Sequence, residues 1–147
     1  MSVFKLRFWG TRGSIPAPGA KTQRYGGNTS CVELRCGQAL FILDAGTGIR
    51  ELGDKLMKES GGKKIEADLF VTHTHWDHIQ GFPFFVPAYI KGNRFLIHGA
   101  HGVGKSFEKI FRGLMDPSYF PVDLGLLARI KSGHRYAPRN DRGNSPA

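Results

Sequence analysis

Apolar and polar residues alternate strictly at the start of the chain, over residues 3–8, and this period of two predicts a β-strand. Two further strands are predicted at 29–36 and 38–44, with Gly37 at the tight turn between them. Residues 10–28 are rich in Gly, Pro and Ser and predict a long loop before this hairpin.

Apolar residues at helical spacing predict two amphipathic helices, at about 49–59 and about 105–115. The residues that give the two patterns are Ile49, Leu52 and Leu56 in the first, and Phe107, Ile110, Phe111 and Leu114 in the second. The pair Gly61-Gly62 is expected to end the first helix.

Two short apolar runs predict buried strands, at 65–72 and 95–98. Between them, residues 79–90 are apolar and aromatic but are broken by Pro83 and Pro87. Strands that alternate with helices indicate an α/β protein, in which helices flank a mixed β-sheet.

Composition narrows the class of protein. The chain has 147 residues, the size of one domain, and its 20 glycines predict many tight turns. No stretch has the roughly 18 apolar residues of a membrane span, and the N-terminus lacks a signal-peptide core. Cys31 and Cys36 are five apart, so on one strand they face opposite ways and do not bridge each other. We therefore expect a reduced, cytoplasmic protein with no membrane partner.

The net charge of +9 favours anionic partners such as phosphodiesters or nucleic acid. Residues 131–147 contribute +3 of this charge, from four cations against one aspartate, and residues 1–130 contribute the other +6. The last segment has no apolar period and is rich in Gly, Pro, Asn and Arg, which is typical of a disordered basic tail. We expect a folded domain over 1–130 and such a tail over 131–147.

Four candidate metal ligands lie within six residues, immediately after the predicted strand 65–72. They are His73, His75, Asp77 and His78. His73 and His75 point to one side of an extended segment, and Asp77 and His78 follow where the chain must turn. Imidazole and carboxylate groups suit Zn²⁺ or a similar divalent ion, and the carboxyl end of a strand is where open α/β sheets bind ligands.

This cluster resembles the HxHxDH signature of the metallo-β-lactamase-fold hydrolases, with THTHWDHIQG at 72–81. Further segments resemble a bacterial branch close to the ribonuclease Z and cyclic-phosphodiesterase-like members. They are FWGTRGS at 8–14, RYGGNTS at 24–30, LDAGTG at 43–48, FPFF at 82–85 and YFPV at 119–122. The resemblance covers residues 3–130 and implies a metal-dependent hydrolase.

The resemblance implies a role for each matching residue. His73 and His75 would bind a first metal ion, and Asp77 and His78 a second. The ions would be Zn²⁺ or Mn²⁺, and a hydroxide between them would attack a phosphodiester, either a small anionic molecule or nucleic acid. Asp77 would also handle the proton. Asp44 would orient the ligand loop, although a simple turn aspartate is the competing interpretation from local sequence.

The family fold is an αββα sandwich of two similar halves, and the later metal ligands come from the second half. Only His98, His101 and His134 follow the cluster, and none resembles a later motif. Each ion would have two protein ligands, whereas a catalytic zinc has about three. We therefore expect the N-terminal half of such an enzyme, with an incomplete ligand set. Its uncovered sheet face would favour oligomerisation, and a non-catalytic truncated remnant is one alternative.

A second alternative is nucleotide binding. Residues 99–106 read GAHGVGKS and match the P-loop pattern through Gly99, Gly104, Lys105 and Ser106. The segment follows a predicted strand and precedes a predicted helix, so its backbone N–H groups could surround a phosphate. Only 41 residues follow Ser106 (147 − 106), which is too few for the usual nucleotide-binding domain.

Overall fold

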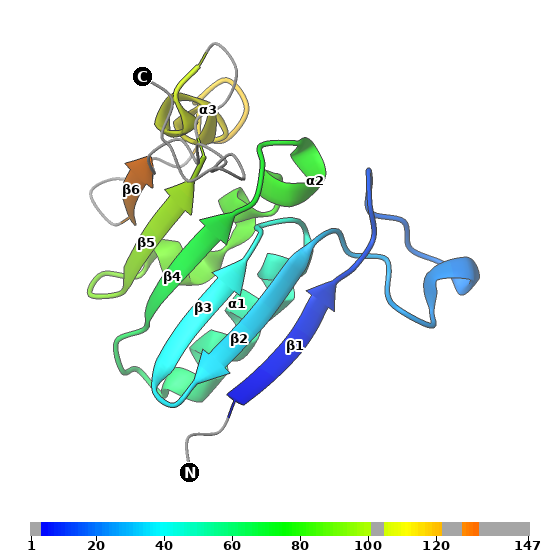
Figure 1. Ribbon diagram of the computed structural model, residues 1–147, viewed down its shortest axis with the longest axis horizontal. Coiled ribbons are helices and arrows are strands. Elements are labelled where there is room, and N and C mark those ends of the chain that lie inside the picture. Colours follow the sequence, from blue (N-terminus) through cyan, green and yellow to red (C-terminus); the bar gives the residue numbers. More distant parts are fainter. Residues whose placement is uncertain (1–3, 101–104, 122–127, 133–147) are drawn as a thin grey trace, which may run out of the picture.

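A computed structural model describes residues 4–100, 105–121 and 128–132 of the chain (Figure 1). These residues form one six-stranded sheet with the strands in chain order. The strands are β1 (Phe4–Gly10), β2 (Cys31–Cys36), β3 (Ala39–Leu43), β4 (Glu66–Val71), β5 (Arg94–Gly99) and β6 (Ala128–Ser132). Strands β1 to β3 pair antiparallel and β3 to β6 pair parallel, so the mixed sheet expected from the sequence is confirmed.

The helices are α1 (Gly48–Ser60), α2 (Trp76–Ile79) and α3 (Phe107–Gly113), with short 3₁₀ helices η1 (Ala20–Thr22), η2 (Phe82–Phe84) and η3 (Val86–Tyr89). Both predicted amphipathic helices are confirmed, as α1 and as a shorter α3. Gly37 and Gly61 have φ values of 58° and 55°, a left-handed conformation that suits a hairpin turn and a helix end. No described helix is both long and apolar enough to cross a membrane.

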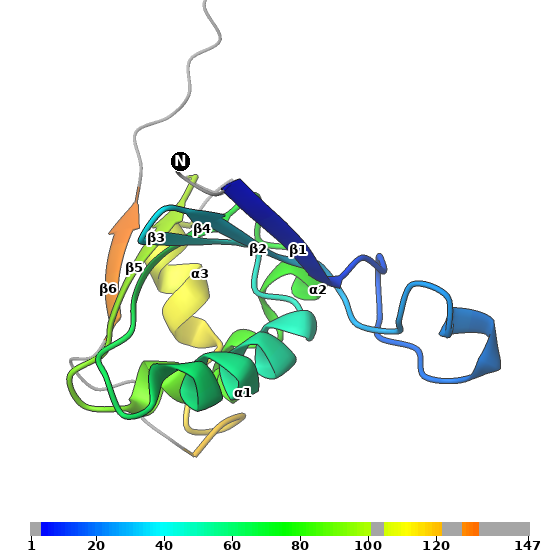
Figure 2. The same cartoon turned by 90° about the horizontal axis from the view of Figure 1, so that it is seen from below.

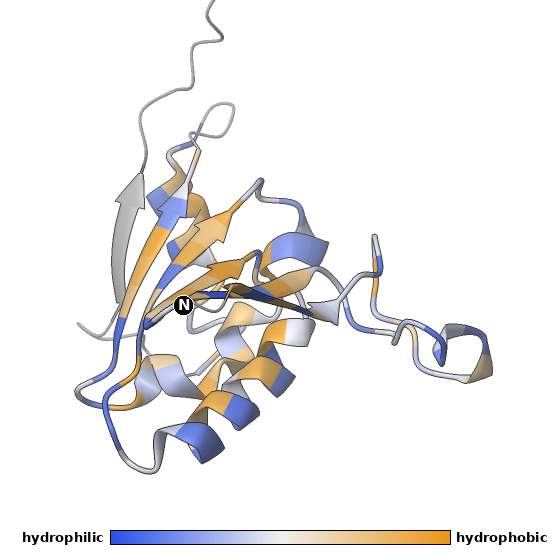
Figure 3. Cartoon of the chain, turned by 60° about the horizontal axis from the view of Figure 1, so that its bottom comes forward, coloured by the Kyte–Doolittle hydropathy of each residue, from blue (hydrophilic) through white to orange (hydrophobic). Residues whose placement is uncertain are grey.

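The core lies on one face of the sheet, where α1, α3, η2 and η3 pack (Figure 2). Alternate residues of each central strand point into it, as Leu40 and Ile42 do from β3. Helix α1 directs its apolar side to the sheet and its charged side away from it (Figure 3). Five phenylalanines are fully buried between these layers: Phe82, Phe85, Phe95, Phe107 and Phe111.

The opposite face of the sheet is covered by no other described element (Figure 2). Phe4, Leu6 and Phe8 of β1 are 68%, 46% and 62% exposed there. On the same face, Nε2 of His98 donates a 2.6 Å hydrogen bond to Oδ1 of Asp68, and the ring stacks on Phe70. We call this side of the sheet the open face. It is compatible with half of a metallo-β-lactamase-like sandwich, in which a second sheet would cover it.

Cys31 lies in the core and Cys36 is exposed at the other end of β2, so the two thiols are free, as expected.

Strand β6 was not predicted, and it runs across the expected boundary between residues 130 and 131. Its backbone pairs with β5, a long-range contact that local composition does not reveal. The rest of the expected tail, 133–147, lies outside the described residues.

Candidate metal centre

The histidine cluster lies at the carboxyl ends of β3 and β4, beside helix α2 (Figure 1). His73 and His75 follow β4 in extended chain, and Asp77 and His78 stand in α2. Asp44 directly follows β3, the parallel neighbour of β4. Parallel pairing thus brings together one carboxylate and a cluster that is about thirty residues later in the chain.

Two glycines let the turn after β3 pack directly on α2. The backbone N–H of Ala45 donates to the carbonyl of His78 at 2.7 Å, and that of Gly81 donates to the carbonyl of Ala45 at 2.9 Å. A Cβ on Gly46 would clash with the Asp77 carbonyl, and one on Gly81 would clash with the Gly46 carbonyl. Contact between backbones therefore fixes the position of α2, and with it Asp77 and His78.

Asp44 is buried and holds the centre together. Its φ of 61° is unusual for a residue with a side chain and turns the carboxylate towards the cluster. Oδ1 accepts hydrogen bonds from the backbone N–H and the hydroxyl of Thr72, both at 2.8 Å. Oδ2 accepts from Ser30 Oγ at 3.2 Å and pairs with His78 Nδ1 at 2.7 Å. Asp44 therefore does more than close a turn.

These contacts also select the ring nitrogens that stay available. A carboxylate only accepts hydrogen bonds, so Nδ1 of His78 donates to Asp44 and its Nε2 faces the cluster. The Thr72 hydroxyl donates its single hydrogen to Asp44. Nδ1 of His73, 3.1 Å from that hydroxyl oxygen, is therefore the donor in the contact between them. With Nδ1 engaged in both rings, Nε2 is the nitrogen that remains for another partner, which in His78 lies 3.5 Å from Asp77 Oδ2.

The three histidine rings are in contact and partly open to solvent. The ring centroids of His73 lie 4.5 Å from those of His75 and 4.0 Å from those of His78. Asp77 Oδ2 lies 3.5 Å from His78 Nε2 and accepts a 2.9 Å hydrogen bond from the backbone N–H of Ser14. That hydrogen bond, more than the nearby histidines, holds the pKa of Asp77 below its usual value.

The donor set fits a divalent cation in kind and in spacing. Two ligands about 2.1 Å from a tetrahedral ion lie about 3.4 Å apart, close to the 3.5 Å between His78 Nε2 and Asp77 Oδ2. Within the described residues, however, no three His, Cys, Asp or Glu side chains are placed to hold one ion together. Asp77 and His78 are the one pair of these side chains whose possible ligand atoms have a measured separation, and the assignment of metal ions to pairs of ligands stays a prediction.

The residues of the alternative nucleotide site lie elsewhere, between β5 and α3. Gly99 ends β5 with the Phe107 ring packed against its Cα, and Ser106 caps α3 by accepting from the backbone N–H of Lys109 at 3.2 Å. Gly104 falls outside the described residues. Lys105 is exposed, and nucleotide binding through these residues stays a prediction.

Three contributors to the centre were not singled out from the sequence. Thr72 and Ser30 hold Asp44, and the backbone of Ser14 holds Asp77. All three stand inside the segments that carry the family resemblance, which was the available signal. A backbone donor such as Ser14, 63 residues before its acceptor, has no signature in side-chain chemistry.

Comparison with known proteins gives one informative match. The chain is 27% identical over 125 residues to ribonuclease Z from Haloarcula marismortui. The alignment covers 83% of this chain but 37% of that protein, so the chain spans well under half the length of the curated relative it matches. No protein-family model matches the chain. The similarity to ribonuclease Z, a protein of the metallo-β-lactamase fold, supports that superfamily and nothing finer.

Proposed function

We propose that this chain carries the metal-binding half of a metal-dependent hydrolase of the metallo-β-lactamase superfamily, acting on phosphodiesters. The observation that supports the proposal best is the orientation of His73 and His78. The Nδ1 atoms of His78 and His73 donate to the Asp44 carboxylate and to the Thr72 hydroxyl, which leaves Nε2 of each ring for another ligand. Hydrogen bonds that orient the ring through Nδ1 are typical of histidines that bind a metal through Nε2.

His73 and His75 would hold one divalent ion, and Asp77 and His78 a second, with Zn²⁺ favoured by the imidazole ligands. Bound ions of this kind supply Lewis-acid stabilisation of the charge that develops on a phosphoryl group, and they lower the pKa of water. Asp44 and Thr72 orient the ligands. Asp77, whose carboxylate the Ser14 N–H keeps ionised, is the group that would accept a proton from the attacking water.

The proposed substrate is a phosphodiester, with RNA as the class named by the relative, ribonuclease Z. The basic charge of residues 1–130, +6 in all, favours an anionic substrate. The relative is much longer than the stretch matched here, so its activity is carried over only as part of the proposal.

Hydrolysis of bis(p-nitrophenyl) phosphate in the presence of Zn²⁺ or Mn²⁺ tests the activity. We expect release of nitrophenol that chelation by EDTA abolishes and that His75→Ala reduces to background. His98→Ala is the matched control, because that imidazole pairs with Asp68 on the open face and should leave the rate unchanged. Equal rates for the His75→Ala variant and the parent would contradict the proposal.

The pairing of ligands favours one alternative, a chain that binds metal without turnover. Zinc sites with four protein ligands bind with apparent free energies of about 10–16 kcal/mol, but two ligands per ion should give only micromolar or weaker affinity. Titration calorimetry with Zn²⁺ separates the cases. Weak binding lost in His75→Ala but without hydrolysis would support the alternative, and tight binding of two ions per chain would contradict the incomplete ligand set.

A further inference from the structure

The long loop between β1 and β2 projects from the body of the molecule as an arm, residues 11–28 (Figures 1 and 2). The arm contains three cations, Arg12, Lys21 and Arg24, and no acidic residue. The first acidic residue of the whole chain is Glu33. Like charges on one projecting segment raise the local positive potential, which favours the approach of an anion.

The arm is a closed structure, which limits the conformational entropy that a ligand would have to remove. At its neck, the backbone N–H of Ala17 donates to the carbonyl of Gly27 at 3.0 Å, and the Thr22 hydroxyl donates to the carbonyl of Ala17 at 2.7 Å. A Cβ on Gly27 would clash with that Ala17 carbonyl, so the neck needs glycine. The side chains at the tip of the arm are therefore held on a backbone loop that is already ordered before any ligand binds.

The three cations of the arm surround a hollow of about 320 Å³. Among the described residues, no Asp or Glu lies within ion-pair distance of any of them. The Arg24 guanidinium lies 5.0 Å from the ring centroid of Tyr25, which is 72% exposed. The hollow thus combines uncompensated positive charge with an accessible aromatic face.

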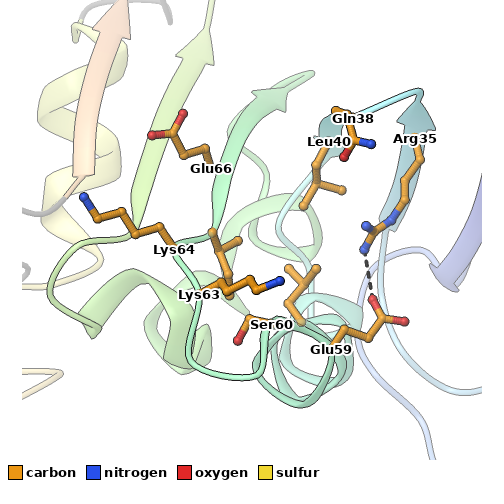
Figure 4. A pocket seen from close by; sticks show the side chains of 10 residues that line it. Arg35, Gln38, Leu40, Glu59, Ser60, Lys63, Lys64 and Glu66 are labelled. Atoms are coloured by element: carbon orange, nitrogen blue, oxygen red, sulfur yellow. Dashed lines mark hydrogen bonds and ion pairs between the residues drawn. The ribbon is translucent and has the colours of Figure 1, made fainter.

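A second pocket, at the amino ends of β3 and β4, shows the contrast (Figure 4). Its cations Arg35, Lys63 and Lys64 share the lining with Glu59 and Glu66. Arg35 pairs with Glu59 at 3.1 Å. Mixed charge of this kind makes a solvated surface rather than an anion site, although it contains as many cations as the arm.

The arm is also connected to the metal centre. Gly13 lines the hollow, and the next residue, Ser14, donates its backbone N–H to Asp77. We infer that the arm binds the phosphodiester backbone of single-stranded nucleic acid and directs the nucleic acid strand towards the histidine cluster. Arg12, Lys21 and Arg24 would contact phosphates, and a base would stack on Tyr25. The inference deepens the proposed function, on which it rests for the kind of ligand.

Fluorescence anisotropy with a fluorescein-labelled single-stranded oligonucleotide tests the inference on the full chain. The titration is done in EDTA, so that binding is measured whether or not the chain hydrolyses anything. The titration is carried out with RNA and with DNA of one sequence, because both have the phosphodiester backbone. For three phosphate contacts, a plot of log K against log[KCl] should have a slope of about −2.

Substitutions assign the binding to the arm. Lys21→Ala and Arg24→Ala should each weaken binding and make the salt slope shallower by about 0.7. Tyr25→Ser should weaken binding about 5-fold to 150-fold, and Tyr25→Phe should restore it, because stacking needs only the ring. Lys63→Ala and Lys64→Ala are the matched controls, since they remove the same charge at the other end of the sheet.

Three results would overturn the inference: no binding of either oligonucleotide, equal loss in the Lys63→Ala and Lys21→Ala variants, or displacement by inorganic phosphate at the concentration that saturates with oligonucleotide. The last result would indicate a site for a small anion instead of a chain. Binding through the arm together with a lack of hydrolysis would sustain the inference and contradict only the proposed function.

Discussion

Asp44 shows how much one residue contributes to the centre. Its carboxylate reaches both elements of the site, His78 directly and His73 through the Thr72 hydroxyl. The left-handed backbone that makes this reach possible costs about 1–3 kcal/mol for a residue with a side chain, and four hydrogen bonds offset it. The strain is therefore part of how the ligands are oriented.

The Thr72 hydroxyl holds the ring of His73 in place. Thr72→Val keeps the shape of the side chain but removes this hydroxyl, so Nδ1 of His73 loses its acceptor and the ring loses its fixed orientation. We expect Zn²⁺ affinity to fall about 10-fold to 100-fold, as for other residues that orient metal ligands. Competition with a chromophoric chelator measures the affinity. Thr72→Ser keeps the hydroxyl and should bind like the parent, and an unchanged affinity in Thr72→Val would refute the role.

Glu33 is a buried charge on the core side of β2 and is not part of the candidate metal centre. It accepts a hydrogen bond from Trp9 Nε1 at 3.0 Å, pairs with Arg35 and lies 3.6 Å from Lys55 Nζ. Burial acts to raise the pKa of Glu33, but the hydrogen bonds from Arg35 and Trp9 and the nearby cations outweigh it, and the pKa lies below its ordinary value of 4.5.

A pKa lowered by folding means that ionised Glu33 stabilises the fold above about pH 4.5 and that this contribution is lost as the pH falls below that value. Glu33→Gln should lower the free energy of unfolding by about 1–3 kcal/mol near neutral pH and flatten its decline in acid. Urea denaturation over a pH series measures both. Glu59→Gln, half-exposed, is the control and should cost under about 1 kcal/mol. Parallel pH profiles for parent and Glu33→Gln would contradict this account.

At the scale of elements, helix α2 is too short to be stable alone and takes its position from the turn after β3. Gly81→Ala should push that turn away from α2, lower the melting temperature and weaken Zn²⁺ binding together, because the same contact positions Asp77 and His78. The stability cost should be about 1–3 kcal/mol. Thermal melts with and without Zn²⁺ measure both effects.

Gly13→Ala is the control for that substitution, because nothing lies within 4 Å of a Cβ at Gly13 and its φ is not in the left-handed region. It should leave the free energy of unfolding within about 0.5 kcal/mol of the parent and the melting temperature nearly unchanged. If Gly81→Ala melted like Gly13→Ala, the close approach of α2 and the turn would not be what holds the site.

At the scale of the whole molecule, the sheet carries large apolar residues on both faces but packs helices on only one (Figure 2). On the open face, β1 exposes Phe4, Leu6 and Phe8, while its other side carries Lys5 and Arg7. An uncovered apolar face of this kind favours association, and a second copy of the chain is the partner always present in solution.

We therefore expect self-association of the isolated chain, with an average mass that rises with concentration in sedimentation velocity. Phe8→Lys should weaken it about 10-fold to 150-fold, because burying a phenylalanine contributes about 1.5–3 kcal/mol. Phe84→Lys is the control, since Phe84 is 56% exposed but contacts Phe120 away from the open face. A parent that stays monomeric at all concentrations would exclude association through this face.

The fold was largely predictable because its signals are local. Alternation predicted β1, the residues around Gly37 predicted the hairpin of β2 and β3, short apolar runs predicted β4 and β5, and helical spacing predicted α1 and α3. Strand β6 was not predicted because the alternation in its sequence, ARIKS, spans only five residues, and its backbone is stabilised by pairing with β5, about thirty residues earlier in the chain.

The candidate site divides in the same way. The sequence by itself determined which donors are present, because His73, His75, Asp77 and His78 stand within six residues and their chemistry is intrinsic to their side chains. Only the tertiary structure decided how they are held. The parallel pairing of β3 with β4 brings Asp44 to Thr72 and His78, and the arm brings the Ser14 N–H to Asp77. Orientation depends on contacts between residues far apart in the chain, and no local pattern encodes them.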